Sequence, residues 1–215
     1  MNATKKSPGR GRPRGFDPDA ALGTAMILFQ QKGYDRVGVA DIGRALGITP
    51  PSFYNAFGSK AALFDKVLDR YADGFGQFVP DALEGGGGAA EAVERVLDDA
   101  ARLYARKDGI AGCLVIDGAR GSCDPEAVAM TARRMEQSQA MIAARIAQEA
   151  PDRADRLAGI VTTALKGMSA AARDGAGADE LRAFAEATAA GFRAVLAQKT
   201  SPAFAGEGGT RTAGG

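Results

Sequence analysis

A chain of 215 residues, of which 46% are hydrophobic, is long enough to bury a sizeable core, and its formal net charge is only +1. It contains no histidine, which excludes Ser-His-Asp and Cys-His catalytic arrangements, and its two cysteines are too few for a disulfide-built scaffold. No apolar run approaches the ~20 residues needed to cross a bilayer, so we expect a cytoplasmic protein with no membrane contact, no metal and no cofactor.

The charged residues are unevenly distributed along the chain. Residues 1–62 carry nine Lys and Arg against four Asp, a net charge of +5, and the remaining residues carry 18 bases against 22 acids, a net charge of −4. A DNA phosphate backbone would attract the first part and repel the second.

Residues 1–15 are polar, basic and rich in Gly and Pro, so we expect them to be disordered in isolation. The sequence Arg10-Gly11-Arg12-Pro13 resembles the core of the AT-hook, whose arginines lie in narrow A·T-rich minor grooves. We therefore expect Arg10, Arg12 and Arg14 to contact DNA. The alternative is a solvated tail that adds only non-specific attraction.

Helical patterns begin directly after this arm. Residues 17–33 carry an apolar stripe with a helix-start signal before it and a glycine after it. In the next helix Val39, Ile42 and Leu46 share one face, and Gly47 suits the left-handed turn that follows. No stretch of the chain alternates with a two-residue period. We therefore expect an all-α fold.

A third, short helix begins with Thr49 as a side-chain cap and a proline in the first turn. Phe53 and Phe57 are four residues apart and can point into the core. The outer side of this helix is then formed by Pro51, Ser52, Tyr54 and Asn55. Ser59 is placed to cap the next helix, with Lys60 in its first turn, which is a suitable arrangement for binding phosphate. This is the outline of a helix-turn-helix.

The run GITPPSFYNAFGSKAALF, with Ile42, Ala45 and Leu46 upstream, resembles the DNA-binding domain of TetR/AcrR-type transcriptional regulators. The resemblance covers roughly residues 16–68, and the rest of the chain agrees only in length and helical pattern. Gly38 stands where the family usually has Ser or Thr, so a phosphate contact made there by a hydroxyl would be missing. The alternative is a three-helix structural bundle that never touches DNA.

The resemblance implies roles for individual residues. Tyr54, Ser59 and Lys60 would hold phosphates, Pro51, Ser52 and Asn55 would face base edges, and Thr49 could serve either group. It also implies a division of the chain into a basic arm (1–15), a helix-turn-helix domain (16–62), a helical ligand-binding and dimerisation domain (63–200) and a disordered tail (201–215).

In the second domain we expect the helix that begins after Ser59 to continue unbroken to Phe78 and to act as a lever between the domains. Residues 80–88 are expected to form a loop, residues 89–106 the next helix, and residues 107–112 a turn. Residues 112–123 are expected to contain a central helix that borders a ligand cavity. The expected wall residues are Tyr71, Phe75, Tyr104, Cys113, Asp117, Arg120 and Arg134, which indicate a mainly apolar ligand with a polar group.

Cys113 admits two interpretations. It can be a thiol that senses oxidants or electrophiles, or a small buried packing residue; no adjacent base explains a lowered pKa of its thiol. A helix from residue 125 to about 150 is expected to turn Val128, Met135, Ile142 and Ile146 inward.

The last two expected helices, which begin near Pro151 and Asp179, are rich in Ala and Gly, and this allows close approach between helices. In the family these helices pair with their copies across a two-fold axis, which implies a homodimer. The alternative is an Ala-rich core within one chain.

The sequence therefore predicts a homodimeric transcriptional regulator, most often a repressor in this family, that binds a near-palindromic DNA operator and responds to a small-molecule effector. Three alternatives are an architectural DNA-binding protein without an effector, a redox-responsive regulator that acts through Cys113, and a small helical enzyme. The missing histidine counts against the enzyme.

Overall fold

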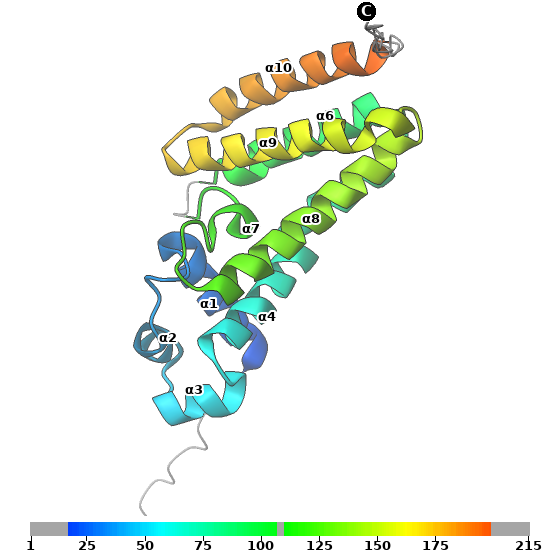
Figure 1. Ribbon diagram of the computed structural model, residues 1–215. Helices are drawn as coiled ribbons and strands as arrows, with labels where there is room; N and C mark the ends of the chain where they lie inside the picture. The colour runs from blue at the N-terminus through cyan, green and yellow to red at the C-terminus, as the bar shows by residue number, and fades with distance from the viewer. Residues whose placement is uncertain (1–16, 107–109, 199–215) are drawn as a thin grey trace, which may run out of the picture.

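The computed structural model describes residues 17–106 and 110–198, and all regular elements in these ranges are helices (Figure 1), which confirms the predicted all-α fold. The helices are α1 (Pro18–Lys32), α2 (Val39–Leu46), α3 (Pro50–Phe57), α4 (Lys60–Asp73), α5 (Phe78–Glu84), α6 (Ala89–Tyr104), α7 (Leu114–Asp117), α8 (Pro125–Ala147), α9 (Ala154–Arg173) and α10 (Ala178–Ala197). Two short 3₁₀ helices connect them: η1 (Phe75–Gln77) lies between α4 and α5, and η2 (Pro151–Arg153) lies between α8 and α9. The predicted arm, with Arg10, Arg12 and Arg14, and the predicted tail lie outside the described residues.

Helices α1 to α3 and the first turns of α4 form a head at one end of the molecule (Figure 1). Phe29 of α1 and Phe64 of α4 are fully buried, with ring centroids 4.9 Å apart, and the Tyr34 ring lies 4.9 Å from that of Phe64. These aromatic contacts join α4 to the head, because α4 supplies part of the head's own core.

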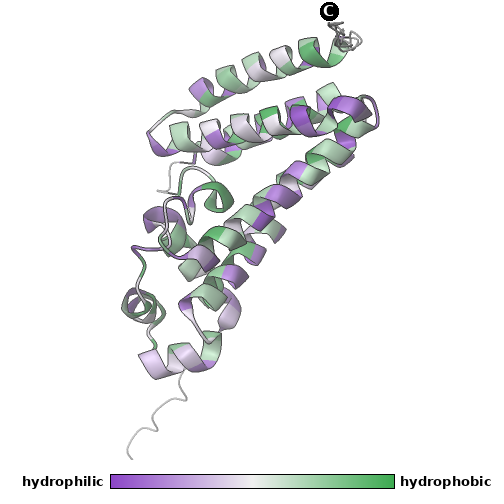
Figure 2. Ribbon diagram, in the orientation of Figure 1, coloured by the Kyte–Doolittle hydropathy of each residue, from purple (hydrophilic) through white to green (hydrophobic). Residues whose placement is uncertain are grey.

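Helices α5 to α10 form the body. Helix α10 packs against α6 and α9, and α8 packs against α9. The largest fully buried body side chains include Leu97, Ile142, Ile146, Leu157 and Met168, which confirms the predicted inward positions of Ile142 and Ile146. Helix α10 lies at the outer edge of the body yet keeps apolar residues along much of its visible side (Figure 2).

The prediction of one unbroken helix from Ser59 to Phe78 is wrong. Helix α4 ends at Asp73, because Gly74 leaves the helical region with φ −111° and ψ −90°. The chain then makes the turn η1 and begins α5, which covers most of the segment predicted as a loop. Pro80 is tolerated in the first turn of α5, where a backbone N–H has no helical partner to lose.

The predicted central helix is also much shorter than expected. Helix α7 has only four residues, and a loop with Gly118 and Gly121 leads to α8. The Gly118 carbonyl accepts a 2.7 Å hydrogen bond from the backbone N–H of Tyr34, so this loop also contacts the head. A Cβ atom on Gly118 would lie only 2.5 Å from the Leu114 carbonyl oxygen.

Three smaller predictions need correction. Thr49 makes no side-chain cap to the helix backbone. Helix α8 ends at Ala147, three residues before the predicted end at Ala150. Val128 is 41% exposed, although it was predicted to point inward.

Candidate DNA-binding surface and effector cavity

Helix α3 is attached to the head by two phenylalanines. Phe53 and Phe57 are buried, with ring centroids 5.5 Å apart. Tyr54 is 53% exposed although its ring touches that of Phe53 edge-on, with centroids 5.3 Å apart. The predicted outer residues are all exposed: Pro51, Ser52, Tyr54 and Asn55. Helix α3 therefore presents one polar face to solvent, supported by a buried aromatic face.

The turn between α2 and α3 depends on two glycines. Gly47 has φ +66°, the left-handed conformation predicted for it. Gly43 lies so near the turn that a Cβ there would be 2.9 Å from the Ile48 carbonyl oxygen. The Thr49 hydroxyl, instead of capping α3, lies 3.0 Å from the Ser52 hydroxyl. This hydrogen bond holds two predicted DNA-contacting side chains together at the start of α3.

Helix α4 begins beside α3, as Figure 1 shows. The Ser59 hydroxyl caps α4 by accepting a 2.9 Å hydrogen bond from the Ala62 N–H. The Lys60 ammonium lies 3.9 Å from the centroid of the Tyr34 ring. The α4 N-terminus thus combines the positive end of a helix dipole with a positioned cation, and both favour a phosphate group.

Gly38 begins α2 without a side-chain cap. Its backbone N–H donates a 3.0 Å hydrogen bond to the Asp41 carboxylate. This bond is the main cause of the lowered pKa of Asp41. The cap at this helix start is therefore supplied by Asp41.

Tyr34 and Asp35 connect the head to the loop that precedes α8. The Tyr34 hydroxyl donates a hydrogen bond to the Asp124 carboxylate at 2.9 Å. Asp35 accepts hydrogen bonds from the Ser122 hydroxyl at 2.5 Å and from the Cys123 N–H at 3.0 Å. Asp124 also caps α8. The start of α8 is thereby tied to the Tyr34 ring on which Lys60 rests.

The Tyr34 to Asp124 hydrogen bond leads to a prediction on acid stability. The bond is the largest cause that lowers the pKa of Asp124 below its usual 3.8. Because the folded state favours the carboxylate, this stabilisation is present above pH 3.8 and is lost as the pH falls through the lower folded pKa. We expect Tyr34→Phe to be less stable than the wild type at pH 6, with the difference narrowing below pH 4, as measured by urea unfolding. A difference that stays constant with pH would contradict this account.

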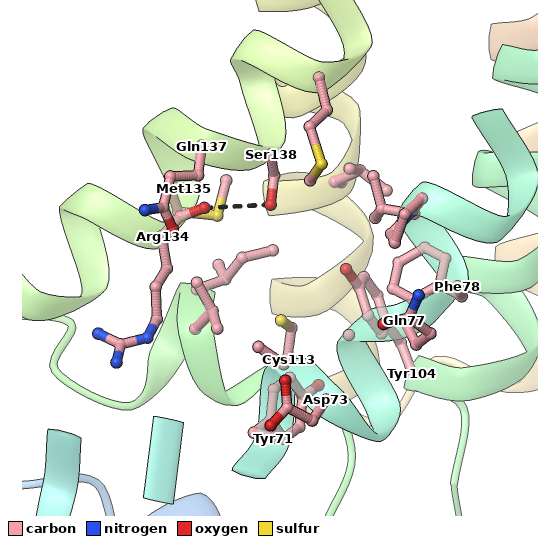
Figure 3. A pocket seen from close by; sticks show the side chains of 18 residues that line it. Tyr71, Asp73, Gln77, Phe78, Tyr104, Cys113, Arg134, Met135, Gln137 and Ser138 are labelled. Atoms are coloured by element: carbon pink, nitrogen blue, oxygen red, sulfur yellow. Dashed lines mark hydrogen bonds between the residues drawn. The ribbon is translucent and has the colours of Figure 1, made fainter. Parts of the chain in front are cut away.

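A cavity of about 230 Å³ is lined by residues from α4 to α9. Its lining is mainly apolar. At one end Cys113 lies beside Tyr71 and Tyr104 (Figure 3). Gln137 and Ser138 lie across the cavity on α8, and Gln77 and Phe78 border another side. The cavity is suited to a small, mainly apolar compound with one or two polar groups.

Four of the seven residues predicted to bind a ligand line this cavity: Tyr71, Tyr104, Cys113 and Arg134. The other three lie elsewhere. Phe75 packs on Tyr71 with ring centroids 5.7 Å apart and faces outer grooves. Asp117 is buried, accepts a 2.5 Å hydrogen bond from Ser169 and lies 3.2 Å from the Arg120 Nε. Asp117 and Arg120 line a different cleft, between the head and the body.

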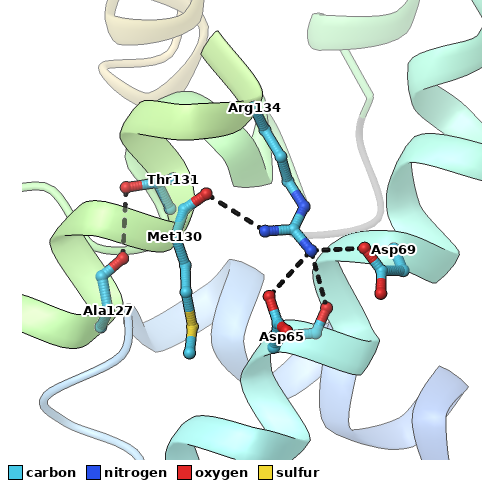
Figure 4. Close-up of polar contacts among 6 residues, drawn as sticks. All are labelled: Asp65, Asp69, Ala127, Met130, Thr131 and Arg134. Atoms are coloured by element: carbon cyan, nitrogen blue, oxygen red, sulfur yellow. Dashed lines mark hydrogen bonds and ion pairs between the residues drawn. The ribbon is translucent and has the colours of Figure 1, made fainter. Parts of the chain in front are cut away.

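Arg134 of α8, which lines the cavity, also contacts helix α4 (Figure 4). Its guanidinium points away from the cavity, pairs with Asp65 of α4 at 2.9 Å and pairs with Asp69 of the same helix. It also donates to the carbonyl of Met130 at 3.1 Å. These contacts connect the cavity-lining side of α8 to two carboxylates of α4.

Sequence reasoning overlooked Gln77 and Ser138 as wall residues. Ser138 carries a signal that was available, because Arg134, Ser138 and Met141 are spaced i, i+4 and i+7 on one face of α8. Gln77 offers no such signal, because the turn η1 that positions it was itself predicted as helix.

Burial raises the pKa of the Cys113 thiol, and it also raises the pKa values of Tyr71 and Tyr104. Cys113 is only 7% exposed. The thiol is therefore protonated near neutral pH, and a protonated thiol is a poor nucleophile.

This difference between the two cysteines predicts a labelling result. Cys123 is exposed, so we expect iodoacetamide at pH 8 to modify it at least tenfold faster than Cys113, as followed by mass spectrometry. In Cys123→Ser the native protein should stay almost unlabelled until urea unfolds it. Rapid labelling of Cys113 in the folded protein would show that the thiol is activated after all.

The comparisons with known proteins agree with this arrangement. Residues 21–67 match the family model "Bacterial regulatory proteins, tetR family". The chain is 38% identical to the HTH-type transcriptional repressor BdcR of Escherichia coli (strain K12) over 196 residues, covering 91% of this chain and 99% of that protein. It is 36% identical to the repressor ComR of the same organism, covering 86% of this chain and 91% of that protein.

Among solved structures, the chain resembles the TetR family regulator CifR, in a cysteine-mutant form complexed with a 26-base-pair operator DNA. The TM-score is 0.76 at 31% identity, covering 83% of this chain and 98% of that one. In the part of the present chain that the structure describes, no helix is long and apolar enough to cross a membrane.

Proposed function

Because the chain belongs to the TetR family and is a DNA-binding transcriptional regulator, we propose that it is a repressor released from a near-palindromic operator by a small, mainly apolar effector. It would act in the cytoplasm, where its DNA is. The observation that carries the proposal is the exposed polar face of α3, presented by the buried Phe53 and Phe57 and flanked by the capped N-terminus of α4.

Each side chain on this face has a proposed role. Asn55 is suited to a bidentate contact with adenine, and Pro51 can only offer apolar contact, for example to a thymine methyl group. Ser52 faces bases, and Thr49, linked to it at 3.0 Å, serves bases or phosphates. Tyr54, Ser59 and Lys60 hold phosphates. Arg10, Arg12 and Arg14 enter the adjacent minor groove.

A homodimer is the natural form for such a protein. Large apolar side chains remain exposed on α9 and α10: Ile160, Phe184 and Val195. A Cβ atom added at Gly159, Gly167 or Gly191 of these helices would meet no neighbouring atom within 4 Å. An apolar, small-residue face of this kind supports close packing against a second copy. The two α3 helices would then enter successive major grooves ~34–36 Å apart.

The effector would act through α4 and α8. Arg134 is the link, because it lines the cavity and pairs with two carboxylates of α4. DNA and effector would favour different positions of α4, so each would weaken the binding of the other by the same factor.

Selection of binding sites from random duplex DNA tests this proposal. We expect enrichment of one near-palindrome whose halves repeat at about one DNA turn, ~10 base pairs. Failure to enrich any sequence, with binding that falls steeply with salt, would favour an architectural DNA-binding protein instead.

The redox-responsive alternative has a specific observation on its side, because Cys113 lines the cavity together with Tyr71 and Tyr104. The raised pKa of its thiol counts against it. If Cys113→Ser abolished the response to an oxidant while keeping DNA binding, the alternative would replace the effector proposal.

A further inference from the structure

A second, polar cleft of about 370 Å³ lies between the head and the body. Its walls come from the end of α1 and the loop after it, from the loop between α7 and α8, and from the end of α9. Four basic side chains line it: Lys32, Arg36, Arg120 and Arg173. Neither the DNA-binding surface nor the effector cavity uses this cleft.

The guanidinium group of each of the three arginines makes one contact with the protein. Arg36 donates through Nε to the Lys32 carbonyl at 2.9 Å, and Arg173 donates through one terminal nitrogen to the Gln30 carbonyl at 3.0 Å. Arg120 Nε lies 3.2 Å from the Asp117 carboxylate. Each guanidinium has further N–H donors, and among the described residues these donors have no other hydrogen-bond or ion-pair partner. Guanidinium groups held in this way are pre-organised for bidentate contacts.

The two acids that line the cleft are already engaged. Asp35 accepts hydrogen bonds from Ser122 and Cys123, and Asp117 accepts one from Ser169 and pairs with Arg120. Lys32, Arg36 and Arg173 form no ion pair with a carboxylate in the described part of the chain, although Lys32 lies near enough to Asp41 to lower the pKa of that carboxyl. The side chains that line the cleft therefore carry an excess of positive charge, four bases against two acids.

We infer that this cleft binds a small anion with two or more phosphate groups, which bridges the head and the body. Four basic side chains from separate elements line the cleft, and a di- or triphosphate group offers them more anionic oxygens and more negative charge than a single phosphate does. DNA is a less suitable occupant, because two of the cations, Arg120 and Arg173, belong to the body, and residues 63–215 carry net negative charge.

Titration calorimetry of the full chain with sodium pyrophosphate, and with inorganic phosphate as the single-phosphate probe, tests this inference. We expect saturable binding of one pyrophosphate per chain, and weaker binding of phosphate. Arg173→Gln and Arg120→Gln should each weaken pyrophosphate binding at least tenfold, because each removes a charge-assisted bidentate contact.

Two control variants make the result decisive. Arg133→Gln removes an exposed arginine of α8 outside the cleft and should bind pyrophosphate as the wild type does. The full chain with Arg10, Arg12 and Arg14 all changed to Gln should also bind normally. No saturable binding, equal weakening by Arg133→Gln, or loss only in the arm variant would overturn the inference.

A last outcome would assign the cleft to DNA. If Arg120→Gln and Arg173→Gln weakened binding to operator DNA without added anion and reduced its salt dependence, as expected for Lys60→Ala, the cleft would be a DNA backbone contact and the inference would be wrong. The calorimetric test needs no DNA, so its failure would leave the proposed regulator unaffected.

Discussion

Phe184→Asp is expected to convert the protein into a folded monomer that has lost most of its affinity for the operator. Phe184 is 47% exposed in the single chain, so the change removes little from the core of the protomer. In the proposed dimer it would bury a carboxylate from each copy in an apolar interface, which is strongly unfavourable. Loss of simultaneous binding to two half-sites should weaken DNA binding roughly 10²- to 10⁴-fold.

Sedimentation equilibrium and circular dichroism check this prediction together with a DNA titration. Val128→Asp is the matched control, because Val128 is another exposed apolar residue, 41% exposed, but lies on α8. Phe184→Leu should keep the dimer. A Phe184→Asp protein that remained dimeric and bound DNA normally would show that the dimer forms through a different surface.

Asn55→Ala is expected to weaken binding to the preferred sequence and to relax specificity at one base pair of each half-site. A bidentate side-chain contact to a base is worth about 1–3 kcal/mol, so the loss is roughly 5- to 150-fold per half-site. Asn55 is uncharged and exposed, so neither folding nor non-specific binding should change appreciably.

Tyr54→Phe is the informative comparison for Asn55→Ala. It removes only a hydroxyl proposed to contact phosphate, so it should weaken binding to all sequences alike. Competition titrations with the selected site and with single-base variants of it separate the two results. Equal effects of Asn55→Ala on all sequences would show that Asn55 reads no base.

The head could be predicted well because its signals are local. The spacing of Phe53 and Phe57 and the position of Gly47 each reflect backbone geometry within one or two turns. The structure accordingly places the two phenylalanines in the core and leaves Tyr54 exposed. The prediction that Thr49 caps α3 was wrong because a side-chain hydroxyl has more than one possible partner. The Thr49 hydroxyl contacts the Ser52 hydroxyl instead.

The body was harder to predict because its contacts are distant in sequence. Arg134 forms an ion pair with Asp65, which lies 69 residues earlier in the sequence, and no sequence pattern indicates that pair. Asp117 was expected in the cavity, but α7 is a single turn whose Cys113 end faces the cavity while Asp117 faces Ser169. The end of α4 at Gly74 also escaped prediction, because apolar spacing continues through Phe75 and Phe78.

The central claim is sequence-specific DNA binding through α3, and fluorescence anisotropy on the duplex upstream of the protein's own gene tests it most directly. The titration should include excess unrelated duplex, the variant Tyr54→Ala and a form lacking residues 1–14. We predict tight binding that survives the competitor, is lost with Tyr54→Ala and is weakened without the arm. Binding that the competitor abolishes, both on this duplex and on sites selected from random DNA, or that Tyr54→Ala leaves intact, would contradict the claim.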